Sequence, residues 1–298
     1  MKTTKHLSKH QLDFFDTFGY LGFPGLLKDR IDKIIEAFED VWVKAGRTND
    51  GTTRSALVPL ADQSEYLSSL LDDPRIHDIA SSICGEDFNY YSGDGNYYVG
   101  DTKWHSDGYK TRPVKSIKIA FYLDPVRKNS GALRVIPGSH KTDDTFASLL
   151  QSHLIKSNPS DGLKTDAPVL FGIPGEEIPA VALESNPGDI LVFNHNIKHS
   201  SWGGSDRRRM FTMNFSERYP DHLTDHLKEV LGDEARFFID RIHGPAMIKT
   251  ATPERMLHLE QVRENDTHMA DVVKKMRESG SPHLKDKERI LCKSYYIP

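Results

Sequence analysis

The chain has 298 residues, of which 37% are hydrophobic and 28% are charged, and its formal net charge is −4. This composition is typical of a globular protein with enough apolar residues for a substantial core, arranged as one large domain or two small ones. The slightly acidic balance argues against nucleic acid or an anionic membrane as a partner, because both need a concentrated basic surface. No run approaches the roughly 18 apolar residues of a membrane-spanning helix, so no membrane partner is expected.

The two cysteines, Cys84 and Cys292, lie far apart, and neither belongs to a CxxC pair. A single disulfide between them is compatible with this count, but free thiols in a reducing cytoplasm are favoured. The polar stretch Met1–His6 is not followed by the apolar segment of a secretory signal. We therefore expect a cytoplasmic protein. The sequence leaves open whether it forms a homo-oligomer.

The N-terminal part, about residues 8–84, is predicted to be helical. Ser8 followed by Gln11 is a capping-box pattern at the start of a short amphipathic helix. Residues 26–46 carry apolar side chains at helical spacing, and the same pattern returns over residues 64–84.

The pattern changes at about residue 88, and residues 88–217 are predicted to form a β-rich core. The aromatic runs 88–91 and 96–99 flank Ser92-Gly93-Asp94-Gly95 and predict a hairpin. Residues 116–124 are mostly apolar and predict a central strand. Further strands are predicted at residues 131–136, 179–183, 189–193, 199–202 and 208–215.

The remaining segments complete the predicted architecture. Residues 156–177 form a long polar stretch with Pro and Gly, and a connection of that length is usually functional, often a lid, or disordered. Residues 220–278 are predicted to be helical. Helices, then about eight antiparallel strands, then helices predict a mainly β core with flanking helices in one domain over residues 1–298. Such a core is typical of a double-sheet, cupin-like jelly roll.

His105 and Asp107 are the first candidate site residues. On a strand, residues two apart point to the same face, so this imidazole and this carboxylate would lie side by side. Together they provide half of a metal site. The alternative is a surface histidine and aspartate in a polar loop.

A third ligand is available from His195 or His199, which follow the predicted strand 189–193. Either would complete a set of two imidazoles and one carboxylate, the facial triad typical of non-haem Fe(II) oxygenases. That set leaves coordination positions open for a cosubstrate and O₂. Spacing alone does not choose between the two histidines, and each could instead be a solvent-facing loop residue.

Several segments resemble a known family. The run Asn129–His140 (NSGALRVIPGSH) is similar to the signature of the phytanoyl-CoA dioxygenase family, and Trp104–Asp107 and Asn186–Phe193 resemble further family segments. Residues 11–20 also resemble the N-terminal helix of that family where it enters the first strand. The resemblance implies an oxygenase on a double-stranded β-helix that uses Fe(II), the cosubstrate 2-oxoglutarate and O₂.

The resemblance also implies a ligand set. In the family, the distal metal-binding histidine is followed two positions later by a serine. His199 with Ser201 fits this pattern and His195 does not. We therefore expect His105, Asp107 and His199 to bind the metal, with His195 as the alternative to His199. No catalytic residue beyond the metal ligands is expected.

An arginine that follows the distal histidine binds the far carboxylate of 2-oxoglutarate in this family, a role that suits the planar guanidinium fork. The candidates are Arg207, Arg208 and Arg209, at a slightly shorter spacing than usual. Strand alternation places Arg208 on a mostly polar face and Arg209 on an apolar one. We therefore expect Arg208, with Ser201, to bind the cosubstrate, and Arg209 is the alternative.

Tyr98 and Leu133 are further candidates for this site. The implied reaction is hydroxylation of an unactivated C–H in a small molecule, a natural product or an amino-acid-like metabolite, with release of succinate and CO₂. Asp107 favours hydroxylation, or sometimes desaturation or ring formation, over halogenation, because iron halogenases of this fold have Gly or Ala at that position. The missing basic cluster argues against coenzyme A, although Lys110 and Arg112 could meet a smaller anionic group.

Two other functions are compatible with the same ligands. One is a non-catalytic, metal-binding cupin-type sensor or degenerate relative. The other is a Zn(II) hydrolase, which would need a general base and no site for a 2-oxo acid.

Overall fold

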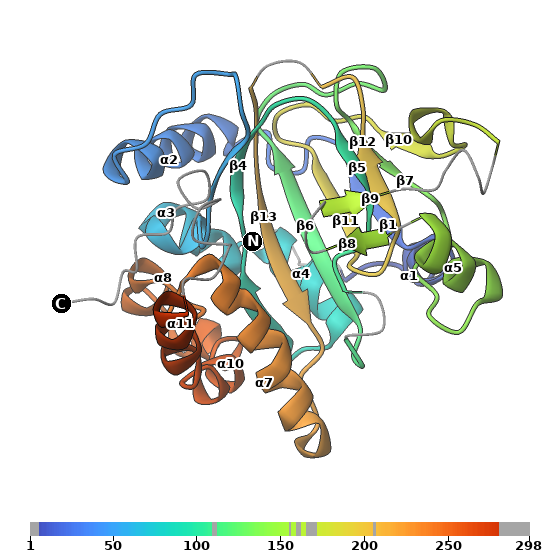
Figure 1. Ribbon diagram of the computed structural model, residues 1–298. Helices are drawn as coiled ribbons and strands as arrows, with labels where there is room; N and C mark the ends of the chain where they lie inside the picture. The colour runs from blue at the N-terminus through green and yellow to red at the C-terminus, as the bar shows by residue number, and fades with distance from the viewer. Residues whose placement is uncertain are drawn as a thin grey trace.

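The computed structural model describes residues 6–108, 112–154, 172–204 and 207–279, together with the backbone of residues 156–158 and 162–164. Within these ranges, antiparallel sheets form a β core with helices on its flanks (Figure 1). The predicted jelly roll with flanking helices is confirmed. Most of the expected lid over residues 156–177, and also Lys110 and Cys292, lie outside the described residues.

The larger sheet has seven strands among the described residues. Six of them follow one another in the order β1 (Tyr20–Phe23), β11 (Ile190–Asn194), β6 (Ser116–Tyr122), β13 (Arg208–Ser216), β4 (Gly95–Tyr98) and β2 (Ser55–Leu57). The seventh, β3 (Asn89–Ser92), also pairs with β13. Strand β6 lies between β11 and β13, so the apolar run at residues 116–124 forms the central strand that it predicts.

The smaller sheet carries most of the site residues. Its order is β10 (Val181–Leu183), β7 (Leu133–Val135), β12 (His199–Ser201) and β5 (Thr102–His105). Strands β8 (Lys156–Asn158) and β9 (Gly162–Lys164) form a separate two-stranded ribbon. Side chains from both larger sheets line one common cavity, which therefore lies between them.

The predicted hairpin around Ser92 is wrong. Strands β3 and β4 do not pair with each other; both pair with β13, one after the other along its length. Ser92 has a φ of 100°, and a Cβ on Gly93 would lie 1.8 Å from the carbonyl oxygen of Thr212. The segment therefore lies directly against β13 as an irregular stretch between β3 and β4, and the chain does not reverse direction there.

The first two helices are close to prediction. Helix α1 (Lys9–Phe18) begins at the capping box of Ser8 and Gln11. Helix α2 (Ile31–Lys44) begins later than the predicted residue 26, because the residues before it form turns. The N–H of Leu27 in these turns donates to the carbonyl oxygen of Gly188, which holds the segment against the start of β11.

The predicted helix over residues 64–84 is interrupted. Its pieces are η1 (Ala61–Gln63), α3 (Glu65–Ser68), η2 (Ser69–Asp72) and α4 (Pro74–Cys84). Pro74 cannot continue a helix, because its nitrogen has no hydrogen to donate, but it suits the first turn of a new one. Asp73 caps that new helix by accepting from the N–H of Arg75.

The remaining helices come from two later parts of the chain. Helix α5 (Thr145–Leu149) continues into a π-helical turn, η3 (Leu150–Leu154), and η4 (Gly175–Glu177) precedes β10. The C-terminal elements are η5 (Asp221–Leu223), α7 (Thr224–Asp233), η6 (Glu234–Phe237), α8 (Pro245–Lys249), α9 (Pro253–Leu257), α10 (Glu260–Asn265) and α11 (Met269–Glu278). Figure 1 shows α7, α8, α10 and α11 gathered on one side of the larger sheet. Across the part of the chain described, no helix has the length and apolar character of a membrane span.

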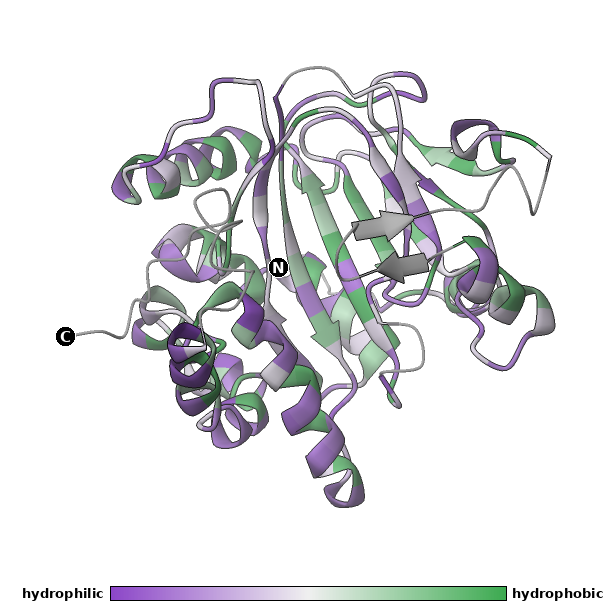
Figure 2. Cartoon of the chain, in the orientation of Figure 1, coloured by the Kyte–Doolittle hydropathy of each residue, from purple (hydrophilic) through white to green (hydrophobic). Residues whose placement is uncertain are grey.

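Two apolar clusters hold the β core in place. One lies between the N-terminal helices and the larger sheet, where Phe38 and Trp42 of α2 pack on Tyr97 of β4. The other lies inside the jelly roll and includes Leu133 and Phe193. In Figure 2 the central strands are largely hydrophobic, whereas α11 is mostly hydrophilic. The single domain over residues 1–298 stays a prediction.

Candidate metal centre and cosubstrate pocket

The side chains of His105, Asp107 and His199 converge on one point. Strand β12 pairs with β5 so that His199 lies opposite His105, and their ring centroids are 4.1 Å apart. The two carboxylate oxygens of Asp107 lie 3.9 Å from Nε2 of His105 and 3.7 Å from Nε2 of His199. One ligand atom from each residue lies within 4.8 Å of the others.

Asp107 reaches this point from a bend, because β5 ends at His105. The expectation that both residues lie on one strand face is therefore wrong, although their side chains do meet. The N–H of Asp107 donates to the carbonyl oxygen of His195 at 2.8 Å. This hydrogen bond fixes the bend.

Both histidines present a free nitrogen lone pair. Nδ1 of His105 lies 2.8 Å from the carbonyl oxygen of Lys103, and Nδ1 of His199 lies 2.9 Å from that of Ile197. A carbonyl oxygen only accepts, so each Nδ1 carries the hydrogen and each Nε2 is available to a metal. Burial lowers the pKa of His105 and lowers that of His199 to about 3, so both rings are neutral at pH 7.

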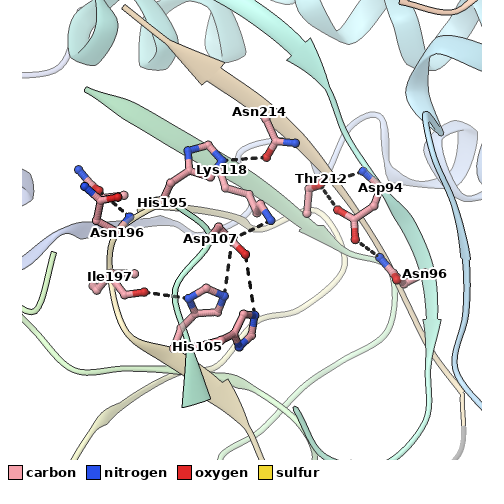
Figure 3. Close-up of polar contacts among 12 residues, drawn as sticks. Asp94, Asn96, His105, Asp107, Lys118, His195, Asn196, Ile197, Thr212 and Asn214 are labelled. Atoms are coloured by element: carbon pink, nitrogen blue, oxygen red, sulfur yellow. Dashed lines mark hydrogen bonds and ion pairs between the residues drawn. The ribbon is translucent and has the colours of Figure 1, made fainter. Parts of the chain in front are cut away.

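The carboxylate of Asp107 is ionised. Burial alone would raise its pKa, but the ammonium of Lys118, with its Nζ 2.8 Å from Oδ2, holds the pKa well below its usual range (Figure 3). Two neutral imidazoles and one carboxylate match the donor set of a non-haem Fe(II) centre. The residues present therefore fit the metal.

His195 lies beside this group but outside it. It is 1% exposed, and its Nε2 lies 3.1 Å from Oδ1 of Asn214, away from His105 (Figure 3). The structure thus brings His199 to His105 and Asp107, and it gives His195 a different position on the same cavity.

Arg208 is a buried cation that faces the cavity. It is 6% exposed; its Nη1 donates to Oγ of Ser201 at 2.9 Å and to the carbonyl of Gly131, and its Nη2 donates to the carbonyl of Gly100 at 3.1 Å. Among the described residues it has no carboxylate partner, and its Nε has no hydrogen-bond partner. Buried charges are normally paired, so this arginine is a candidate to bind an anionic ligand.

Gly131, from the NSGALRVIPGSH run, makes room for this arginine. Its φ is +83°, and a Cβ there would lie 1.7 Å from Nη1 of Arg208. Any other residue at this position would meet the guanidinium.

Arg209 points away from the cavity. Its Nη2 lies 2.6 Å from Oδ1 of Asp124, and its Nη1 lies 2.8 Å from Oε1 of Glu39. Two carboxylates already neutralise it. Strand alternation predicts this difference correctly, because Arg208, Met210 and Thr212 line the cavity while the residues between them face the helices.

Tyr98 and Leu133 both line the cavity near Arg208. The guanidinium carbon of Arg208 lies 5.5 Å from the ring centroid of Tyr98. The cavity has a volume of about 340 Å³, at the small end of the range for small-molecule sites. Val230, Leu231 and Phe237 of the C-terminal helices form part of its wall.

The sequence prediction did not include Lys118. A lysine in the middle of the apolar run of residues 116–124 is itself a signal, because a buried charge on a central strand needs a partner in the interior. Its partner, Asp107, lies in the bend after β5 of the smaller sheet and is not identifiable from spacing.

Comparison with known proteins decides the family. The model of the phytanoyl-CoA dioxygenase family matches residues 15–211, about two thirds of the chain. The chain belongs to the phytanoyl-CoA dioxygenase family. The predictions of this family and of the class, a non-haem dioxygenase that uses Fe(II), 2-oxoglutarate and O₂, are thereby confirmed.

One curated relative is the ectoine dioxygenase of Sphingopyxis alaskensis, which is 28% identical over 164 residues, or 47% of this chain. The chain matches about half the length of that relative, 50%.

Solved structures of low sequence identity share the fold. HygX from Streptomyces hygroscopicus, with nickel and 2-oxoglutarate bound, has a TM-score of 0.54 at 16% identity, over 72% of this chain and 89% of that one. The carbocyclase SnoK from nogalamycin biosynthesis has a TM-score of 0.53 at 22% identity, over 72% and 86%.

Proposed function

We propose that this dioxygenase hydroxylates an unactivated C–H of a small molecule, a natural product or an amino-acid-like metabolite, and releases succinate and CO₂. In this proposal His105, Asp107 and His199 hold Fe(II). The observation that carries it is the shared cavity, onto which this donor set and Arg208 both open. Arg208 is a buried cation with no carboxylate partner among the described residues. When bound, Fe(II) supplies the activation of O₂, which is coupled to oxidation of the cosubstrate.

The protein groups position the reactants. The carbonyls of Lys103 and Ile197 fix the ring tautomers, so both Nε2 atoms stay directed at the metal position. Lys118 holds Asp107 in its ionised form and takes up one carboxylate oxygen, which leaves the other oxygen for the metal.

Arg208 and Ser201 bind the far carboxylate of 2-oxoglutarate. The two side chains are already joined at 2.9 Å, so the arginine is held in place before the cosubstrate arrives. Preorganisation of this kind lowers the entropy lost on binding. Arg209 is excluded from this role by its two carboxylate partners.

The substrate is small. A cavity of about 340 Å³ that also receives 2-oxoglutarate cannot enclose a coenzyme A thioester. Apolar side chains such as Phe193 and Met210 line the walls and exclude water from the reacting carbon. Asp107 occupies the position that a halogenase needs for chloride, which favours hydroxylation. We further propose that the protein works in the reducing cytoplasm, with the buried Cys84 as a free thiol.

Succinate formation tests the function. Anaerobically Fe(II)-loaded protein is mixed with 2-oxoglutarate and O₂ and challenged with a panel of amino-acid-like and natural-product metabolites. We expect at least one compound to stimulate succinate release and to gain one oxygen atom, with no stimulation in His199→Ala. If no compound stimulates the wild-type protein, the non-catalytic sensor is favoured instead.

A further inference from the structure

A second arginine, Arg112, faces the same cavity and is half-buried. Its aliphatic stem packs over the backbone of Gly108, where a Cβ would lie 2.8 Å from Cδ and Nε of the arginine. Its guanidinium carbon lies 5.4 Å from the ring centroid of Tyr91. Gly108 directly follows the ligand Asp107, so this cation lies next to the metal-binding bend.

Arg112 has no counter-ion among the residues described. Besides Arg112 and Arg208, three cationic side chains in the described ranges line the cavity, and each of them has a carboxylate within 4 Å. These pairs are Lys118 with Asp107 at 2.8 Å, Arg54 with Asp94 at 3.7 Å, and Arg236 with Glu234 at 3.2 Å. By contrast, Nη1 of Arg112 is buried and has no hydrogen-bond partner in the described part of the chain. A guanidinium in this state is a strong donor to an anion.

His195 adds a second unsatisfied atom on this wall. Because Oδ1 of Asn214 accepts from its Nε2, the hydrogen of the neutral ring is on Nε2 and Nδ1 carries a lone pair. That Nδ1 is buried and has no partner among the described residues.

We propose that Arg112 and His195 form the subsite that recognises the substrate, which is a small organic carboxylate that also carries an N–H or O–H group. Arg112 donates to the carboxylate and Nδ1 of His195 accepts from the N–H or O–H. The assignment rests on the proposed function, because it takes this cavity to be where the substrate binds. Arg208 binds the cosubstrate, so the two carboxylates of the reaction are bound by different arginines.

The test uses protein loaded with Zn(II) and saturated with 2-oxoglutarate, in which no oxidation occurs. The probes are benzoate and benzamide, which have the same shape but differ in charge. Side-chain ¹⁵N–¹H NMR follows the Nε–H resonance of Arg112, assigned by its loss in Arg112→Lys. We expect benzoate to shift this resonance saturably and benzamide to leave it unchanged. In Arg112→Met, benzoate should bind at least about tenfold more weakly, because a charge-assisted hydrogen bond is lost.

Arg207→Met is the matched control. Arg207 also lies over a tyrosine, with 5.3 Å between its guanidinium carbon and the ring centroid of Tyr97, but it does not line the cavity. Benzoate binding should be unchanged in this variant. Equal binding of benzamide, or wild-type binding by Arg112→Met, would overturn the carboxylate subsite.

The role of His195 has its own readout. The ¹⁵N resonance of Nδ1 should move with 3-hydroxybenzoate or 4-hydroxybenzoate and stay in place with benzoate, because only the former carry a hydroxyl. His195→Phe should remove the affinity that the hydroxyl adds. If neither hydroxybenzoate shifts the Nδ1 resonance, the proposed role of His195 as a hydrogen-bond acceptor is overturned. Since Zn(II) supports no turnover, a failure of the proposed hydroxylation leaves these readouts intact.

Discussion

Replacing Arg208 by alanine removes the cation that we assign to the far carboxylate of 2-oxoglutarate. Arg208 is 6% exposed, and the existing partners of its guanidinium are neutral groups, the Oγ of Ser201 and two backbone carbonyls. Losing one partner of a buried, hydrogen-bonded charge pair costs about 2–5 kcal/mol. About 1.4 kcal/mol corresponds to a factor of ten in affinity. The Kd for 2-oxoglutarate should therefore increase by a factor of between about 30 and a few thousand.

The assay is calorimetric titration of 2-oxoglutarate into Zn(II)-loaded protein. Arg207→Ala is the control: it removes an exposed charge next to Arg208 in the sequence and should bind 2-oxoglutarate with the wild-type Kd. Arg209→Ala should lower the free energy of unfolding, because it leaves Asp124 and Glu39 without their partner, but it should keep the wild-type affinity within a few-fold. Weak binding by Arg209→Ala together with normal binding by Arg208→Ala would refute the assignment.

Three other predictions concern the metal ligands, the glycine beside Arg208 and the apolar core. His199→Ala should abolish Fe(II) binding in anaerobic equilibrium dialysis, whereas His195→Ala should retain it; the reverse order would exchange the two roles. Gly131→Ala should weaken 2-oxoglutarate binding in the same calorimetric assay, because the added Cβ displaces the guanidinium of Arg208. An unchanged Kd would show that the backbone at residue 131 moves aside and leaves the arginine in place. Phe38→Ala should lower the free energy of unfolding by about 3–5 kcal/mol in urea titrations, because Phe38 is 0% exposed in the core between the N-terminal helices and the larger sheet. A decrease of less than about 1 kcal/mol would contradict that packing.

Local periodicity predicted much of the core of this fold. The apolar run at residues 116–124 is the central strand, and the alternation after Arg207 separates Arg208, which faces the cavity, from Arg209, which faces the helices. Such features depend on neighbours in the chain, so one sequence is enough to define them. The capping box at Ser8 is predictable for the same reason.

Features that depend on distant segments were not predictable. The hairpin at Ser92 failed because β13, more than a hundred residues later, pairs with both of its supposed arms. The ion pair of Lys118 with Asp107 joins strand β6 to the bend after β5, which lie on different sides of the cavity. The choice of His199 over His195 came from the family resemblance; the structure adds the physical reason, which is that His199 begins β12 opposite His105.

The absorption spectrum of the Fe(II) protein tests the central claim most directly. Adding 2-oxoglutarate without O₂ should produce a visible band, because the cosubstrate binds the metal directly. The band should be lost in His199→Ala and kept in His195→Ala. If the wild-type spectrum does not change on addition of 2-oxoglutarate, the cavity between the two sheets is not an Fe(II)/2-oxoglutarate site.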